Sequence, residues 1–222
     1  YLEEAGIEFK LGTATKEIRN NGELVVVDTE KYGELEFEAV LHATGRRANT
    51  EGLGLENTDI ELRPNGTIVV DEFCQTAVEN VFAVGDVNGG LQFTYVSLDD
   101  FRVVNGYLHG NKEYTTADRK NVPYSTFISP ALSHVGLHKE EAEAAYPNVA
   151  VASLPVANMP RGAVNQDPRG LFRVTVDKDT NLILGATLFG KNSEEIINLI
   201  KMAIDNKIPY TYIRDQIFTH PT

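Results

Sequence analysis

Residues 76–86 read TAVENVFAVGD, an apolar run that ends in Gly85 and Asp86. The run predicts a buried strand over residues 80–86. A buried parallel strand that ends in Gly-Asp places a carboxylate at the sheet edge where α/β folds bind ligands, and there it can accept hydrogen bonds from ribose or ribityl hydroxyls. A lone Gly-Asp would more simply be an aspartate that caps the next helix. The eleven-residue run is more specific than its last two residues.

A second apolar stretch precedes this run and also ends in glycine. Residues 38–45 read EAVLHATG and predict a buried strand that enters a glycine turn, followed by Arg46. Gly45 has no Cβ, so the backbone there can approach a cofactor closely. Arg46 can pair with a phosphate or a carboxylate. The alternative for this stretch alone is a strand exit followed by a solvated arginine.

The third motif lies at the end of the chain, where residues 218–222 read FTHPT. Pro221 restricts the backbone of His220, which favours a fixed direction for the imidazole. Histidine is also the side chain best suited to exchange protons near neutral pH. Taken alone, these residues would more commonly be a disordered tail.

Composition narrows the classes of partner. The chain has 20 basic and 32 acidic residues and a net charge of −12, which argues against nucleic acid or an anionic membrane as partner. No apolar run is long enough for a membrane span, and residues 1–4 are acidic where a secretory signal would be basic. Cys74 is the only cysteine, which fits a reducing cytoplasm. We therefore expect a soluble cytoplasmic protein without a metal site.

The pattern of apolar residues predicts alternating strands and helices. A helix end with Gly6 at its C-cap is expected first, and Ser193 is expected to cap the last long helix. The other predicted elements are strands at 7–11, 38–45, 67–71, 80–86, 149–156, 171–176 and 182–189, a hairpin over 24–37, and helices at 95–109 and 140–145. A polar linker is expected at 111–121, followed by a domain of three strands and two helices.

Three motifs in this order and spacing resemble those of the class I pyridine nucleotide–disulfide oxidoreductases. They are ATGR at 43–46, VFAVGD at 81–86 and HPT at 220–222, and the resemblance covers essentially the whole chain. This family includes glutathione reductase, dihydrolipoamide dehydrogenase and mercuric reductase. Most members carry a Thr-Pro-Val-Ala-like segment where this chain has TYVS at 94–97. That variant, with RDQIFTHP at 214–221, resembles the bacterial subgroup tied to defence against reactive chlorine and hypothiocyanous acid.

The resemblance implies an α/β and α+β fold in three pieces. Residues 1–47 would be the C-terminal end of the NAD(P)-binding domain, and residues 48–119 the C-terminal half of the FAD-binding domain. Both would be pieces of Rossmann-like domains. Residues 120–222 would form an α+β dimerisation domain. The chain would thus be the C-terminal part of a longer protein.

The resemblance also implies roles for the residues in the second motif and after it. Asp86 would hold the ribityl chain of FAD, and Gly85 would permit close approach. Phe93 and Thr94 would lie near the isoalloxazine ring, where the N–H groups of a helix start stabilise negative charge.

The two outer motifs would serve the nicotinamide and the thiols. Gly45 would border the nicotinamide side of the site, with Arg46 beside it. His220 would be the acid/base that exchanges a proton with a thiol of the partner subunit in a homodimer. A glutamate would follow His220 by a few residues, past Thr222, and orient the imidazole.

The implied whole protein passes a hydride from NAD(P)H to FAD, then electrons to a cysteine pair and on to a small-molecule oxidant. The glycine-rich nucleotide loops and the dithiol would lie N-terminal to this stretch, so the chain alone is expected to be inactive. Three alternatives stay open: a flavoprotein NADH oxidase or peroxidase with a single redox cysteine, a mercuric reductase-like enzyme, and a purely dimer-forming module at 120–222.

Overall fold

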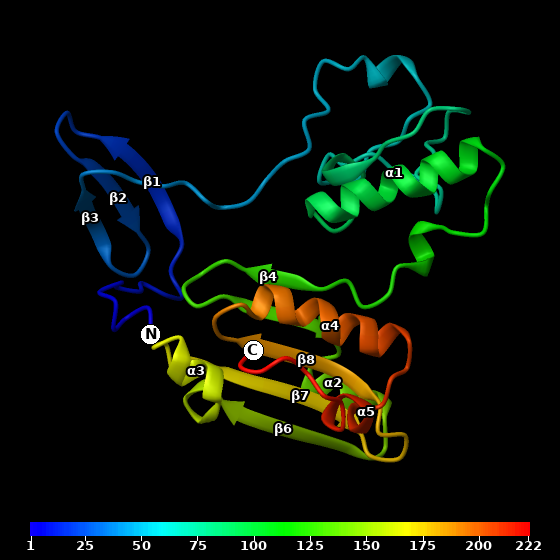
Figure 1. The fold of residues 1–222 in the computed structure, drawn as a ribbon. Helices are drawn as coiled ribbons and strands as arrows, with labels where there is room; N and C mark the ends of the chain where they lie inside the picture. The colour runs from blue at the N-terminus through cyan, green and yellow to red at the C-terminus, as the bar shows by residue number, and fades with distance from the viewer. The chain divides into compact units, whose positions relative to one another are not determined.

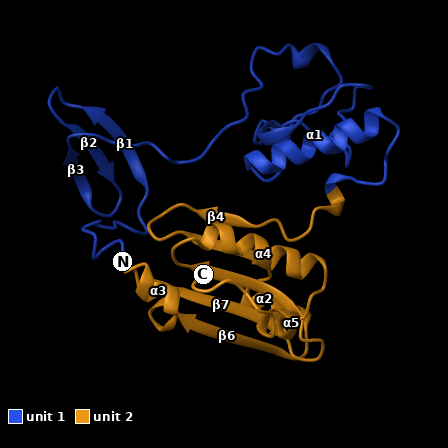
Figure 2. Ribbon diagram, viewed as in Figure 1, with its two compact units in different colours: residues 1–116 blue, residues 117–222 orange.

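The computed structural model describes all residues from Tyr1 to Thr222 and divides them into two compact units. The first unit is Tyr1–Thr116 and the second is Ala117–Thr222 (Figure 2). The boundary falls inside the predicted polar linker at 111–121. No helix in either unit has the length and apolar character that crossing a membrane requires.

The first unit contains a three-stranded antiparallel sheet (Figure 1). Its strands are β1 (Thr15–Asn20), β2 (Val25–Thr29) and β3 (Gly33–Phe37), in the order β1-β2-β3. The predicted hairpin over 24–37 is confirmed, because β2 pairs with β3 and Val26 of β2 is buried. Strand β1 was not predicted, since Ile18 is its only apolar side chain.

The predicted elements at 2–11 are largely wrong. Residues 2–6 form turns and no helix, yet the backbone bonds of a helix end are present. The N–H of Ile7 donates to Leu2 O (3.1 Å) and the N–H of Gly6 to Glu3 O (2.9 Å), which is the Schellman pattern. Gly6 takes the left-handed backbone that this pattern requires, with φ of 90°. Residues 7–11 form no strand, and Leu11 is exposed.

The strands predicted at 38–45, 67–71 and 80–86 are also not formed as strands. Residues 39–50 have no regular structure, and Leu41 is 90 % exposed. The other two segments make only isolated bridges, Leu62 with Ile68 and Gln75 with Phe82. A strand exists only when a neighbour shares its hydrogen bonds, and this chain supplies no extended neighbour to these apolar runs.

The main helix of the first unit is α1 (Thr94–Leu108), which confirms the helix predicted at 95–109. It follows a short 3-10 turn, η2 (Gly85–Asn88), and a second 3-10 turn of this unit is η1 (Leu55–Asn57). A third, η3 (Thr116–Asp118), spans the boundary between the two units. The buried face of α1 consists of Val96, Asp100 and Val103. Two of these are ordinary core residues, whereas the aspartate accepts a hydrogen bond from the backbone of Gly85.

The second unit is built on a five-stranded antiparallel sheet with the order β4-β5-β8-β7-β6 (Figure 1). The strands are β4 (Tyr124–Thr126), β5 (Leu132–Gly136), β6 (Val149–Pro155), β7 (Leu171–Asp177) and β8 (Ile183–Phe189). The last three confirm the predicted strands at 149–156, 171–176 and 182–189. Strands β4 and β5 were not predicted, because both are short and contain serine and other polar side chains.

Four helices complete the second unit. They are α2 (Lys139–Ala145), α3 (Pro160–Val164), α4 (Ser193–Asp205) and α5 (Tyr210–Arg214), with a 3-10 turn η4 (Val156–Asn158). Helices α2 and α4 were predicted, and α3 and α5 are too short for periodicity to show. Helix α4 packs on β5 and β8, where Ile197 joins Val135, Ala186 and Leu188 in the core.

The predicted cap of α4 is wrong in one respect. The N-cap is Asn192, in a left-handed conformation, and Ser193 is the first helical residue. Ser193 is fully buried, and its hydroxyl donates to Ala131 O (2.9 Å) and shares a hydrogen bond with Ser133 (3.0 Å). The serine therefore ties the helix start to the segment that leads into β5.

Candidate cofactor-binding site

The turn at Gly85 is the first part of the candidate site. Gly85 has φ of 74°, a conformation that side chains rarely adopt. A Cβ at this position would also lie 2.9 Å from Ser97 Oγ on α1. Glycine is therefore required at position 85 for two reasons: the backbone conformation and the close approach of the turn to the helix.

Asp86 and Arg46 lie together, although forty residues separate them in the sequence. Arg46 Nη1 donates to Asp86 Oδ2 at 3.1 Å. The side chains are 71 % and 44 % exposed, and an exposed pair of this kind contributes little to stability. The Asp86 carboxylate can therefore exchange the guanidinium for the hydroxyls of a ligand at small cost.

Gly45 lies in the irregular segment before Arg46 and is exposed. Its φ is 114°, so the position suits glycine, but no atom lies within 4 Å of a Cβ built there. The structure therefore brings Gly45 near the Asp86 turn only through its neighbour Arg46.

The start of helix α1 is the second part of the candidate site. Phe93 is the N-cap and Thr94 the first helical residue, and no side chain caps this end. The rings of Phe93 and Tyr95 stack, with centroids 5.0 Å apart and planes 8° apart. Burial raises the pKa of Tyr95, so its phenol stays neutral. An uncapped helix start favours a ligand group with negative charge.

A buried carboxylate on α1, which the sequence pattern did not predict, links these two parts. Asp100 is 1 % exposed, and its Oδ2 accepts the Gly85 N–H (2.6 Å) and the Asn88 side-chain amide (2.9 Å). A signal was present in the sequence, because Asp100 lies four residues after Val96 and three before Val103. Charged residues on such an apolar stripe are rarely buried without a partner.

The third predicted motif lies in the second unit. His220 is exposed, in a bend that follows α5. Arg161 Nη1 of α3 donates to the backbone carbonyl of Pro221 at 3.1 Å. Thr222 Oγ1 donates to Thr219 O at 2.8 Å, so two bonds hold the segment around the imidazole.

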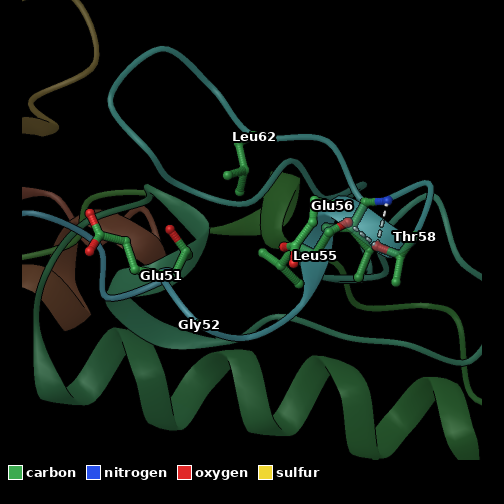
Figure 3. Close-up of a pocket in the computed structure, with 8 residues that line it drawn as sticks. Glu51, Gly52, Leu55, Glu56, Thr58 and Leu62 are labelled. Atoms are coloured by element: carbon green, nitrogen blue, oxygen red, sulfur yellow. Dashed lines mark hydrogen bonds between the residues drawn. The ribbon is translucent and has the colours of Figure 1, made fainter.

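A pocket of about 360 Å³ lies elsewhere in the first unit and contains none of the predicted site residues. Figure 3 shows that Leu55, Glu56, Thr58 and Leu62 line it, along with Glu51. In neither unit do three or more His, Cys, Asp or Glu side chains gather closely enough to hold a metal ion.

Two sequence profiles of one family match the chain. The profile described as pyridine nucleotide-disulphide oxidoreductase matches residues 1–100, and the dimerisation domain of the same family matches residues 122–222. The chain belongs to the pyridine nucleotide–disulfide oxidoreductase family. This confirms the resemblance inferred from the three motifs.

Individual members of the family are similar over the whole chain. The probable pyridine nucleotide-disulfide oxidoreductase RclA of Escherichia coli is 43 % identical over 221 residues, which are 100 % of this chain and 50 % of that protein. A dihydrolipoyl dehydrogenase of Corynebacterium glutamicum is 31 % identical, over 98 % of this chain and 48 % of its own length. The chain thus spans about half the length of the curated relatives it matches.

A solved structure gives the same result for the fold. The structure described as HOCl-induced flavoprotein disulfide reductase RclA from Escherichia coli matches with a TM-score of 0.94 and 43 % identity, over 100 % of this chain and 51 % of that one. The predicted fold class, α/β pieces followed by an α+β dimerisation domain, is confirmed. FAD and a pyridine nucleotide are the cofactors of this family.

Proposed function

We propose that this chain is the C-terminal part of an FAD-dependent NAD(P)H oxidoreductase. The whole protein would reduce a disulfide-type or reactive oxidant substrate through a cysteine pair located outside this chain, which has Cys74 alone. The observation that carries the proposal is the Gly85–Asp86 turn bonded to α1, in a chain 43 % identical over its whole length to a flavoprotein disulfide reductase.

The residues of the first unit fit a flavin. The Gly85 turn is too close to α1 for a side chain, Asp86 presents a half-exposed carboxylate, and the start of α1 at Phe93 and Thr94 has no side-chain cap. Asp86 would accept hydrogen bonds from ribityl hydroxyls, and the helix start would stabilise negative charge on the ring. When bound, FAD supplies the electron transfer between the pyridine nucleotide and the cysteine pair.

Residues 1–47 would belong to the pyridine nucleotide domain and 48–119 to the FAD domain. Gly45 and Arg46 would then lie at the nicotinamide side, with Arg46 adjusting the charge at Asp86. The apolar side chains of Leu41, Val81 and Val84 are exposed in segments that read as strands. Such segments would be completed by further strands of the whole protein, which agrees with the half-length coverage of the relatives.

The second unit would form the dimer interface, as its family description indicates. It exposes large apolar side chains that a partner surface would cover, namely Phe127, Leu199, Met202, Ile217 and Phe218. In a homodimer, His220 would exchange a proton with a thiol of the partner subunit. The only cysteine of the chain is buried, which is consistent with a reducing cytoplasm.

The test uses the whole protein with its bound flavin. NADH and NADPH oxidation are measured with disulfides, reactive chlorine species, hypothiocyanous acid and mercuric ion, for wild type, His220→Gln and the control His109→Gln. We expect His220→Gln to lower turnover about 10²–10⁴-fold with the flavin content unchanged, since a general acid/base contributes that much. A wild-type protein without flavin would contradict the proposal. Turnover with mercuric ion alone would favour the mercuric reductase alternative.

A further inference from the structure

We propose that Asp100 is a positioning residue of the flavin site. Its buried carboxylate holds the Gly85–Asp86 turn against α1, so that Asp86 and the start of the helix face the cofactor as one fixed unit. The inference rests on the proposed function, because it concerns how this chain's own residues are arranged toward FAD.

The contacts of Asp100 reach the turn itself. Its Oδ2 accepts the N–H of Gly85 at 2.6 Å, one residue before the carboxylate proposed to bind the ribityl chain. The same oxygen accepts the amide of Asn88 at 2.9 Å. Asn88 is buried and also donates to Ala83 O (3.3 Å), while its Oδ1 accepts the Gly90 N–H (3.0 Å). One carboxylate and one amide thus bind the turn from residue 83 to residue 90.

The contacts also connect this turn to the helix start. Asp100 lies on α1 three residues after Ser97 and six residues after Thr94. Ser97 lies close to the turn too, since a Cβ built on Gly85 would be 2.9 Å from its Oγ. Ser97 in turn donates through Oγ to the carbonyl of Phe93 (3.4 Å). The turn at Asp86 and the uncapped helix start are therefore connected through the first two turns of α1, by the side chains of Asp100 and Ser97.

Packing alone would not select an acid at this position. Val96 and Val103 flank Asp100 on the buried face of α1, where an apolar side chain would fill the same space. A buried carboxylate is costly unless it is hydrogen-bonded. Here it satisfies two N–H donors that an apolar residue would leave without this acceptor. The acid is explained by its action on the turn.

The test compares two substitutions of Asp100 with a matched control on the same helix. Asp100→Asn keeps the shape but replaces one acceptor oxygen by a donor, and Asp100→Ala removes both oxygens. Asp99→Asn makes the same charge change at the neighbouring residue, whose carboxylate accepts from Tyr114 (2.9 Å). FAD is titrated into the whole protein after removal of its flavin, and the dissociation constant and the visible circular dichroism of the bound flavin are measured.

We expect both Asp100 variants to raise the Kd for FAD about tenfold or more, since each loses charge-assisted hydrogen bonds, and to alter the flavin dichroism. Asp99→Asn should do neither. Amide exchange of residues 83–90 without FAD should also be faster in Asp100→Asn than in wild type. If the Asp100 variants do not fold, Asn88→Ala is measured, and it too should raise the Kd.

The outcomes separate this inference from the proposed function. A wild-type protein that binds FAD, with an unchanged Kd and dichroism in Asp100→Asn or Asn88→Ala, overturns the inference and leaves the proposed function standing. A wild-type protein that binds no FAD overturns both.

Discussion

The guanidinium of Arg161 donates a hydrogen bond to the backbone carbonyl of Pro221, with Nη1 and the oxygen 3.1 Å apart. Arg161 belongs to α3, sixty residues before the bond's acceptor. His220 itself is exposed. The bond therefore fixes the direction of the segment that carries the imidazole, next to the residue proposed to move a proton.

Arg161→Ala is predicted to impair proton exchange at His220 and not flavin reduction. Loss of one charge-assisted hydrogen bond should lower kcat about tenfold in the whole protein. Stopped-flow reduction of the flavin by NAD(P)H should keep its rate. Arg173→Ala is the control, since Arg173 bonds Ser153 on the neighbouring strand (3.3 Å). A slower flavin reduction in Arg161→Ala would contradict this assignment.

Substitutions at Asp86 and Arg46 should differ strongly in their effect on FAD binding, although the two side chains form one ion pair. Asp86→Ala removes the proposed ribityl acceptor and should raise the Kd for FAD roughly tenfold or more. Arg46→Ala removes an exposed partner and should change protein stability by about 1 kcal/mol at most. Flavin fluorescence titrations and thermal unfolding measure the two effects. Equal effects on FAD binding would show that the pair acts as one unit.

A stacked histidine pair lies in the second unit. The rings of His134 and His138 have centroids 3.7 Å apart, and His134 is 5 % exposed. His134 Nε2 donates to Gly136 O (2.9 Å), so Nδ1 accepts from the Thr187 hydroxyl (2.8 Å). Burial is the largest effect and lowers the pKa of His134. The hydrogen bond to Gly136 O raises it by less, and the charges of His138, which lowers it, and Glu141, which raises it, have smaller effects still. The buried ring is therefore neutral.

The lowered pKa of His134 gives a direction for the pH dependence of stability. The unfolded chain binds this proton at about pH 6.5, whereas the folded chain binds it only at lower pH. The stability that the neutral His134 ring contributes is thus fully present above the pKa of the unfolded chain, and it is lost as pH falls toward the lower pKa of the folded chain. The free energy of unfolding should fall between pH 7.5 and about pH 5, and the fall should be smaller in His134→Gln than in wild type. His109→Gln, at an exposed histidine, should keep the wild-type slope.

Two neighbouring apolar residues of α4 are predicted to affect different properties. Ile197 is 2 % exposed in the core, and Ile197→Ala should lower the free energy of unfolding by about 2–5 kcal/mol. Leu199 is 63 % exposed, so Leu199→Glu should leave folding nearly unchanged and weaken the dimer. Analytical ultracentrifugation and denaturant unfolding measure both. Asn198→Glu, between them, is the control, and a dimer unaffected by Leu199→Glu would place the interface elsewhere.

Elements with a clear period were predicted from the sequence, and elements that depend on distant partners were not. The hairpin at 24–37 and helices α1 and α4 follow their apolar spacing. Strand β5 was missed because its buried side chains include Ser133 and His134, whose burial depends on partners far along the chain. The predicted strand at 38–45 failed for the opposite reason, since apolar residues alone do not supply a neighbouring strand.

The candidate site was predicted in part for a similar reason. Local motifs identified Gly85 and Asp86, but no local pattern indicates that Arg46 pairs with Asp86 across forty residues. Asp100 was missed because an acidic residue on a helix is ordinarily read as solvent-facing. Its place between Val96 and Val103 on the buried stripe was the available signal.

The central claim is that this chain completes a flavoprotein that works through a cysteine pair. The most direct measurement is the absorbance of the whole protein under anaerobic conditions, before and after NADH or NADPH. The account predicts a flavin spectrum that gives way to a long-wavelength thiolate–flavin charge-transfer band. Bleaching without that band would point to a single-cysteine oxidase, and a protein without flavin would contradict the account and leave a dimerisation module.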